Sequence, residues 1–224
     1  MDRLTSTIGY IIIGVVLISV LGGCGLEQKR SLNDSGPEEL LEMGLYRLER
    51  KEYDIAVTIF QAIKDRYPYS KTVITAELKM AESYFMRKDY DSALDVYYDF
   101  ERLHPKDINI PYVMYRKGMC HFQQVSTIDR DQTQTFWAKE EFERLVSRFP
   151  KSEYAYKARA YIRKCLVYLA EYELYVGHFY FKNGDYGPAL DRYIYIIENY
   201  PDMGQYHEAL EYISKCKQKL AGTD

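Results

Sequence analysis

The sequence has little net charge and too many apolar residues for a disordered chain. Its 30 lysines and arginines nearly balance 33 aspartates and glutamates, which leaves a formal net charge of −3 over 224 residues. A general nucleic-acid binder needs a basic surface to meet the phosphate backbone, so this balance argues against that class. The hydrophobic content of 47% excludes disorder throughout the chain.

The sequence also lacks the motifs that carry enzyme chemistry. It contains no glycine-rich phosphate loop, no nucleophile elbow and no histidine and cysteine cluster with metal-ligand spacing. His121 follows Cys120, but adjacent helical residues point about 100° apart and do not form a dyad. We therefore expect a protein that is not an enzyme, with no catalytic residues, no metal site and no cofactor.

Cysteines are few, and their spacing is wide. Cys120, Cys165 and Cys216 lie too far apart in sequence for a metal motif. Buried helical thiols are expected, because free cysteine behaves as a small hydrophobic residue. A disulfide stays open as the alternative in an oxidising compartment.

Tyrosine is the residue type in excess. The chain has 24 tyrosines, 9 phenylalanines and a single tryptophan. Tyrosine combines a large rigid ring with a polar tip, so it serves both cores and binding surfaces. Composition alone leaves packing and binding open.

The N-terminus resembles the export signal of a bacterial lipoprotein. Residues 8–21 form an apolar run of about 21 Å as a helix, shorter than the roughly 30 Å core of a bilayer. The Leu21-Gly22-Gly23-Cys24 sequence that follows resembles a lipobox. This resemblance implies a signal peptide over residues 1–23, lipidation of Cys24 and, because Gly25 follows, an outer-membrane destination. An uncleaved anchor is the alternative, and residues 24–36 are interpreted as a polar tether.

Four segments of the remaining chain share one pattern at fixed spacing. In each, an alanine is followed four residues later by an aromatic residue and twelve residues later by a proline. The segments are Ala56, Phe60 and Pro68; Ala93, Tyr97 and Pro105; Ala138, Phe142 and Pro150; and Ala189, Tyr193 and Pro201. Twelve positions before the alanine stand Gly44, Ala81 and Gly177 in three copies. In the third copy we take Gly118 as the equivalent, which implies an insertion of eight residues.

This spacing matches the tetratricopeptide repeat, a helix–turn–helix unit of about 34 residues. Small residues let the two helices approach, the aromatic residue fills the space beyond them, and proline ends the second helix. We therefore expect an all-α, right-handed α-solenoid of about ten helices, or five pairs. The insertion falls on a polar loop over residues 125–132, and a last helix covers about 206–220. Residues 152–167 and 169–181 are interpreted as two helices, with one continuous helix as the alternative.

Binding is the natural function of such an array, because stacked hairpins present a long groove. Tyr112, Tyr115 and Arg116 are candidates, since repeat packing does not require them; core packing is the alternative for the tyrosines. The charged run Asp129, Arg130 and Asp131 is a further candidate, although it could also be a solvated loop whose charges pair with one another.

Several segments resemble the BamD family, the tetratricopeptide lipoproteins of the outer-membrane β-barrel assembly (Bam) complex. The resemblance rests on residues 67–68, 111–118, 129–131, 142–152, 169–177 and 189–192, together with the lipobox. It implies a lipid-anchored protein on the periplasmic face of the outer membrane. The implied partners are a POTRA domain of BamA, other Bam lipoproteins and unfolded β-barrel precursors.

The resemblance also assigns residues to these partners. Arg192 matches the family arginine that contacts BamA, and Lys182 and Asp185 would flank that contact. The precursor groove would lie in the N-terminal repeats, residues 37–126, and the BamA side in residues 127–224. The groove candidates are Tyr84, Tyr112, Tyr115, Arg116, Asp129, Arg130 and Asp131. A tetratricopeptide lipoprotein that serves pilus biogenesis or cell-wall synthesis is the alternative function.

Overall fold

The computed structural model describes residues 34–201 and 203–222. The chain divides into residues 1–36 and residues 37–224, and every helix considered below belongs to the second unit. The expected signal peptide over residues 1–23, Cys24 and most of the expected tether lie outside the described residues.

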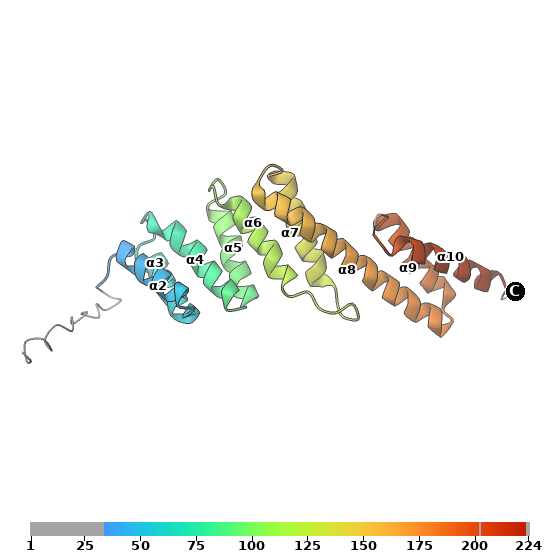
Figure 1. Ribbon diagram of the computed structural model, residues 1–224. Helices are drawn as coiled ribbons and strands as arrows, with labels where there is room; N and C mark the ends of the chain where they lie inside the picture. Colours follow the sequence, from blue (N-terminus) through green and yellow to red (C-terminus); the bar gives the residue numbers. More distant parts are fainter. Residues whose placement is uncertain (1–33, 202, 223–224) are drawn as a thin grey trace, which may run out of the picture. The chain divides into compact units, whose positions relative to one another are not determined.

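The described part of residues 37–224 contains nine α-helices and no strand. They are α2 (Pro37–Glu49), α3 (Tyr53–Arg66), α4 (Thr72–Met86), α5 (Tyr90–Leu103), α6 (Ile110–Phe122), α7 (Thr133–Arg148), α8 (Glu153–Asn183), α9 (Tyr186–Asn199) and α10 (Tyr206–Ala221) (Figure 1). The all-α prediction is confirmed.

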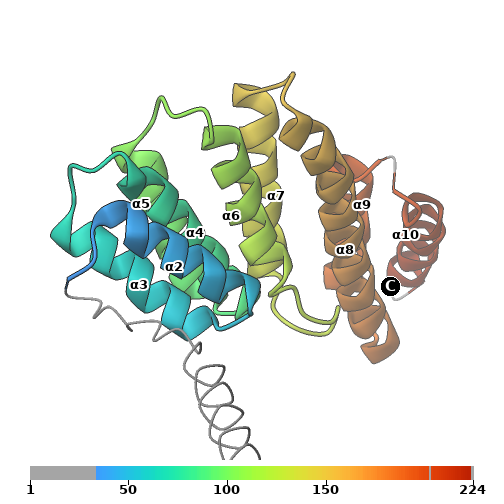
Figure 2. The same ribbon diagram turned by 60° about the vertical axis from the view of Figure 1, so that its left-hand side comes forward.

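The helices form a row of hairpins. Each helix packs against the next one along the chain, and α2 also packs against α4 and α6 against α8 (Figures 1 and 2). The first helices of successive hairpins are therefore neighbours, as in tetratricopeptide arrays. The pairs are α2 with α3, α4 with α5, α6 with α7, and the second half of α8 with α9; α10 follows the last pair.

The glycines of the repeat lie against its aromatic rings, as the spacing predicts. A Cβ atom added to Gly177 would come within 2.7 Å of the Tyr193 ring, and one added to Gly118 within 2.5 Å of the Phe142 ring. The glycine of the first repeat faces its phenylalanine in the same way. Gly118 is thus the third repeat's equivalent residue, and the insertion lies between α6 and α7 as expected.

Proline ends each second helix, as predicted. Helices α3, α5, α7 and α9 each stop two residues before the repeat's proline. The residue between still donates its N–H to the carbonyl four positions back, at 2.8–2.9 Å. Proline cannot donate and restricts the residue before it, so the ladder stops there.

The hairpin turns use one left-handed residue at an equivalent position. It lies two residues before the second helix in three repeats, as Lys51 with φ 62°, Lys88 with φ 66° and Gly184 with φ 87°. Only glycine adopts this region without steric cost. The third repeat replaces this tight turn with its inserted loop.

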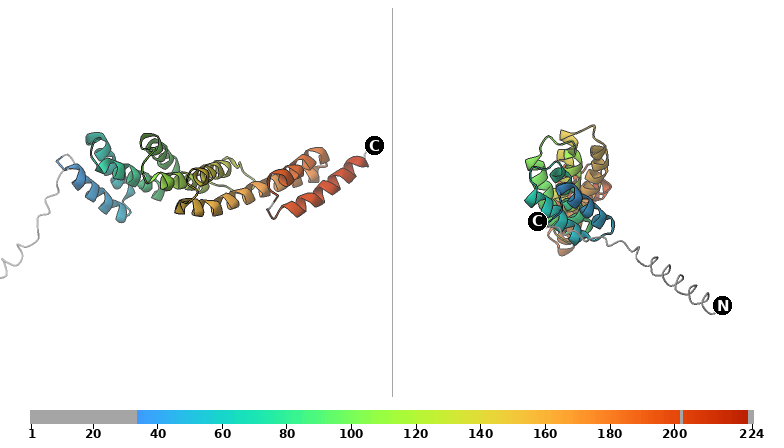
Figure 3. Two further views of the ribbon diagram at one scale, coloured as in Figure 1. Left: turned by 90° about the horizontal axis from the view of Figure 1, so that it is seen from above. Right: turned by 90° about the vertical axis from the view of Figure 1, so that its left-hand side faces the viewer.

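Residues 153–183 form one helix, so the interpretation as two helices is wrong. Helix α8 is 31 residues long and runs from the α6–α7 hairpin to α9 and α10 (Figure 3). Ser152 caps its start by accepting a hydrogen bond from the Tyr154 N–H at 3.2 Å, and Gly184 ends it in the left-handed region. No proline interrupts the segment between them, so the backbone ladder continues.

The three helical cysteines are buried and free, as expected, and the disulfide alternative is wrong. Burial raises the pKa of the Cys120 and Cys165 thiols to about 12. Both side chains therefore remain protonated and act as packing groups.

Candidate protein-binding surfaces

A cleft of about 380 Å³ lies among the first helices of the second, third and fourth repeats. Its lining comes from α4, the start of α6 and the start of α8: Thr75, Leu78, Lys79, Glu82, Asn109, Tyr112 and Tyr154. We call this surface the N-terminal cleft. One wall is aromatic and the other carries a Lys79–Glu82 ion pair at 2.8 Å.

Tyr112 is the one groove candidate that lines this cleft. Its hydroxyl donates to Glu82 Oε1 at 2.7 Å, and its ring meets the Tyr154 ring edge-on with centroids 5.4 Å apart. Burial raises the pKa of Tyr112, and the nearby Glu82 carboxylate adds to the shift. The hydroxyl therefore remains a hydrogen-bond donor at any physiological pH.

Arg116 lies behind Tyr112 and is engaged within the fold. Its guanidinium carbon is 3.7 Å from the Phe85 ring centroid, and its Nε donates to the Tyr97 hydroxyl at 3.2 Å. The same guanidinium lies 5.8 Å from the Tyr112 ring. Arg116 thus supports the aromatic wall from inside.

Tyr115 and Tyr84 lie against the core, outside the lining of the N-terminal cleft. The Tyr115 ring contacts the rings of Phe142 and Tyr161, and burial raises its pKa to about 12. Tyr84 packs on the same core, with the Arg87 guanidinium 4.9 Å from its ring. For Tyr115 the packing alternative describes the observed contacts.

Helix α8 adds aromatic residues that no candidate above included. Tyr154, Tyr161, Tyr168 and Tyr175 recur every seven residues, which keeps them near one helix face. Tyr154 contacts Tyr112, Tyr161 contacts Phe122 at 4.9 Å, and Tyr168 stacks on Phe122 at 6.3 Å. The seven-residue spacing was visible in the sequence and would have revealed this row.

The charged run of the inserted loop lies apart from the N-terminal cleft. Asp129, Arg130 and Asp131 are exposed between the end of α6 and the start of α7, whereas Tyr112 is at the other end of α6 (Figure 2). The structure therefore does not bring the run together with the groove tyrosines.

Gln132 fixes this loop through hydrogen bonds to its backbone. The buried Gln132 amide donates to the carbonyls of Thr127 and Arg130, both at 3.0 Å. Hydrogen bonds from Thr127 and Thr133 lower the pKa values of Asp129 and Asp131. The Thr127 hydrogen bond is the main cause of the lowered pKa of Asp129, and the charge of Arg130 also contributes to it.

Arg192 lines a separate cleft of about 310 Å³ between α8 and α9. The lining residues are Tyr180, Pro188, Asp191, Arg192 and Tyr195. Arg192 Nη1 bonds Glu173 Oε2 at 3.0 Å, and 43% of the arginine side chain is exposed. The hydrogen bond that Arg192 donates to Glu173 raises the pKa of Arg192. Lys182 and Asp185 are both exposed at the adjoining turn.

A buried ion cluster was not predicted from the sequence. Lys117 on α6 is 1% exposed and bonds Glu101 at 2.9 Å and Glu141 at 3.2 Å, and its ammonium lies 3.6 Å from the Tyr98 ring centroid. Arg144 and Arg148 also pair with Glu101. The cluster joins α5, α6 and α7, and its residues line a surface cleft that shares no residue with the N-terminal cleft.

Comparison with known proteins identifies the family. The profile of the YfiO family, described as "Outer membrane lipoprotein", matches residues 33–224. The chain is 32% identical over 198 residues to the outer membrane protein assembly factor BamD of Rickettsia prowazekii, which covers 88% of this chain and 78% of that protein. The chain belongs to the BamD family.

Other relatives agree with this family assignment. The BamD protein of Neisseria meningitidis Z2491, also an outer membrane protein assembly factor, is 30% identical over 84% of this chain and 74% of its own length. Among solved structures, the TPR2AB domain of yeast Sti1 in complex with pHSP90 superposes with a TM-score of 0.50 at 15% identity. That superposition covers 82% of this chain and 70% of the Sti1 chain and shows a shared tetratricopeptide fold.

Two further observations concern membrane and metal. Across the parts of the chain that the structure describes, no helix combines the length and apolar character needed to cross a bilayer. Over the same residues, no three histidine, cysteine, aspartate or glutamate side chains lie close enough together to bind a metal ion.

Proposed function

We propose that the chain is a non-enzymatic adaptor of the outer-membrane β-barrel assembly complex. Membership of the BamD family supports this role. The observation that carries it is the setting of Arg192, a half-exposed guanidinium in a shallow cleft that is paired with one carboxylate of its own chain. A partner carboxylate could replace or join Glu173, because a guanidinium can bond two carboxylates through its several N–H donors.

In this proposal the C-terminal repeats, within residues 127–224, bind BamA. Arg192 forms the charged contact with a POTRA domain, and the aromatic rings of Tyr180 and Tyr195 flank it. Tyr195 is 45% exposed, so a partner can bury it. Lys182 and Asp185 extend the same surface from the α8–α9 turn.

The N-terminal repeats, within residues 37–126, receive unfolded precursors. The aromatic wall of Tyr112, joined by Tyr154 from α8, suits an aromatic side chain of an extended segment. The Lys79–Glu82 pair opposite supplies a donor and an acceptor for its backbone. Individually weak contacts of this kind gain from tethering on one membrane, because tethering raises the effective concentration.

The anchoring step belongs to the same proposal. A signal peptide over residues 1–23 is removed, and Cys24 carries acyl chains that insert into the inner leaflet of the outer membrane. Residues 24–36 then connect the anchor to the repeats on the periplasmic face. Each buried CH₂ contributes about 0.8 kcal/mol, so several chains give a stable attachment. If this anchor is correct, an alkaline wash should release the Cys24→Ala protein from membrane fractions. Retention of this variant in the washed membranes would favour an uncleaved anchor.

Charge reversal at Arg192 tests the central contact. Tagged Arg192→Glu protein, isolated in mild detergent, should recover less than about a tenth of the BamA that the unchanged protein recovers. Arg163→Glu is the matched control, because Arg163 is an exposed arginine of α8 outside this cleft. Equal recovery by both variants, with unchanged helical circular dichroism, would contradict the assignment.

A further inference from the structure

Another cleft, of about 370 Å³, lies where three segments distant in sequence meet. It is lined by the inserted α6–α7 loop, the second half of α8 and the α9–α10 turn with the start of α10. Its residues are Ile128, Glu171, Leu174, Tyr175, His178, Gly204, Gln205 and Glu208. We call it the C-terminal cleft. It contains neither Arg192 nor any residue of the N-terminal cleft.

This cleft has acidic side chains and no lysine or arginine in its lining. Glu171 and Glu208 both contribute carboxylates. The N-terminal cleft and the Arg192 cleft are balanced, with Lys79 beside Glu82 in one and Arg192 beside Asp191 in the other. The negative charge of the C-terminal cleft is therefore not neutralised by its own lining.

The carboxylates have spare capacity to accept hydrogen bonds. Glu208 is 50% exposed at its side chain and meets His178 Nε2 at 3.1 Å with one oxygen. Glu171 receives a long 3.4 Å contact from Gln205 Nε2. The side-chain oxygen of Gln205 is buried and has no partner among the described atoms. A carboxylate offers about four acceptor sites, so donors from a ligand can be accommodated.

The remaining wall is apolar and open. Ile128 is 40% exposed and Tyr175 is 44% exposed, and Leu174, which also lines the cleft, packs against the core. Tyr175 is also the last tyrosine of the seven-residue row along α8. A side chain with an apolar stem and a cationic end would bury these surfaces and reach the carboxylates together.

We propose that the C-terminal cleft binds a basic, extended segment of a partner protein, in which an arginine or lysine lies next to an apolar residue. The cation binds between Glu171 and Glu208, and the apolar neighbour packs on Tyr175 and Ile128. This site adds a third docking surface to the proposed adaptor and does not depend on the Arg192 contact.

Synthetic peptides test the chemistry of this site on the full-length protein in mild detergent. The probe is a fluorescein-labelled ten-residue peptide in which two arginines flank a phenylalanine between glycine–serine ends. Matched peptides carry glutamine or glutamate in place of both arginines. Fluorescence anisotropy should show the arginine peptide binding about tenfold more tightly than the glutamine peptide, with a loss of affinity as salt rises. Equal affinity for all three peptides would overturn the proposal.

Protein variants locate the binding. Glu171→Gln and the double variant Glu171→Gln/Glu208→Gln should weaken the arginine peptide by about threefold and tenfold. The single variant leaves the His178–Glu208 contact in place, so it separates binding from the packing of α10. Unchanged affinity in the double variant would also overturn the proposal. Arg192→Glu should leave peptide binding intact, which distinguishes failure of this site from failure of the proposed function.

Photocrosslinking gives an independent measurement. Benzoylphenylalanine in place of Tyr175 should crosslink to the labelled arginine peptide. An excess of unlabelled arginine peptide should abolish the crosslinked product. The control is the same substitution at Tyr69, which is fully exposed on the α3–α4 turn. Crosslinking of equal strength at both positions would contradict a defined site.

Discussion

The two halves of the helical array are built from the same type of repeat but have different cores. In the N-terminal half, a large apolar cluster runs from α4 to the first half of α8 and lies beside the buried Lys117 ion cluster. In the C-terminal half, a smaller cluster joins the second half of α8 with α9 and α10. The partly buried residues packed against the first cluster are mostly aromatic, whereas those packed against the second are mostly aliphatic. Within the second set, the Tyr212 ring meets His178 at 4.4 Å and Phe181 at 5.1 Å.

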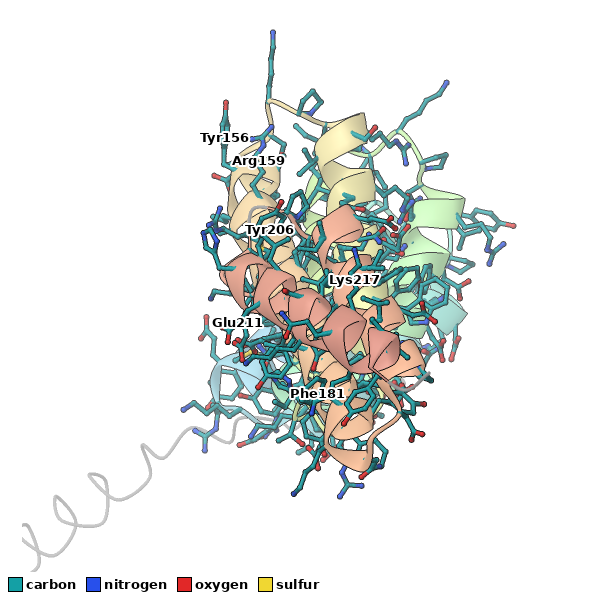
Figure 4. All side chains as sticks on the ribbon, turned by 90° about the vertical axis from the view of Figure 1, so that its right-hand side faces the viewer. Tyr156, Arg159, Phe181, Tyr206, Glu211 and Lys217 are labelled. Carbon is teal, nitrogen blue, oxygen red and sulfur yellow. The ribbon has the colours of Figure 1, made fainter. Side chains whose placement is uncertain are left out.

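Helix α8 is the one element that contributes to both clusters. Cys165 belongs to the first cluster and Leu169 to the second. The boundary between cores therefore falls where the sequence had indicated two helices, although the backbone continues through it. At the C-terminal end, α10 covers this second cluster, with Phe181 below it and Glu211 and Lys217 on its exposed surface (Figure 4). Continuity of a helix and continuity of a core are thus separate properties.

The largest expected effect is on the N-terminal half, through Lys117. Lys117→Ala leaves Glu101 and Glu141, which are 12% and 10% exposed, without their buried cation. Breaking a buried pair from one side costs about 3 kcal/mol of unfolding free energy, although Arg144 retains part of the neutralisation. Urea denaturation followed by circular dichroism measures the loss.

The matched control is Lys106→Ala, because Lys106 is exposed in the turn after α5. We expect it to change the unfolding free energy by less than about 0.5 kcal/mol. If both variants lose the same small amount, the ion cluster does not stabilise this half.

Acid should weaken the same cluster. Burial by itself would raise the pKa of Glu101, but hydrogen bonds from Arg144 and Lys117 outweigh it and lower the pKa from 4.5 to about 2. A depressed pKa stabilises the folded state fully above pH 4.5, and this stabilisation is lost as the pH falls from 4.5 towards 2. We expect a loss of about 2 kcal/mol across that range. Glu101→Gln should flatten the pH dependence, and an unchanged slope would contradict the account.

Both halves pack the glycine of the repeat against its aromatic ring, and substitution of these glycines tests this contact. Gly118→Ala and Gly177→Ala each place a Cβ against a buried ring and should cost about 1–2 kcal/mol in thermal or urea unfolding. Ala81 occupies this position in the second repeat and is fully buried, so the repeat can accommodate a methyl group there. Gly187→Ala is the control, because nothing lies within 4 Å of its added Cβ. If only one of the two variants loses stability, the glycine position does not have the same role in both halves.

Substitutions in the hairpin turns should have the smallest effect on the unfolding free energy. The change should be of opposite sign in the two halves. Lys88→Gly should stabilise the N-terminal half by about 1 kcal/mol, since Lys88 has a positive φ that disfavours side chains. Gly184→Ala should destabilise the C-terminal half by a similar amount for the same reason. Urea midpoints that move in the same direction for both variants would contradict this explanation.

The repeat itself could be predicted because its residues act through local packing. Gly118 lies twenty residues before Ala138 instead of twelve, and its contact with the Phe142 ring agrees with the insertion of eight residues that this offset implies. The inserted loop follows from this excess in the spacing, whereas α10 is predicted by the amphipathic pattern after Pro201. In contrast, periodicity does not decide the continuity of α8. The last two repeats are 51 residues apart instead of 37, and the excess of 14 residues between Pro150 and Gly177 is close to four helical turns. Such an excess preserves the helix face whether or not the chain breaks.

The candidate sites could be predicted only in part. Tyr112 was recognised because no repeat position requires it, yet its neighbour Tyr154 lies 42 residues away in sequence and becomes adjacent only through folding. Lys117 was missed because a lysine in a helix is usually solvated. Its burial depends on Glu101 and Glu141 meeting it from two other helices, which a single sequence does not show.

The two halves are proposed to bind different partners, and one paired capture experiment separates the two contacts. Tagged full-length protein carrying Arg192→Glu or Tyr112→Ala is isolated in mild detergent, and recovery of BamA and of a β-barrel precursor is measured in each sample. The account predicts that Arg192→Glu loses BamA and retains the precursor, whereas Tyr112→Ala loses the precursor and retains BamA. Loss of both partners, or of neither, in each variant with folding intact would contradict it.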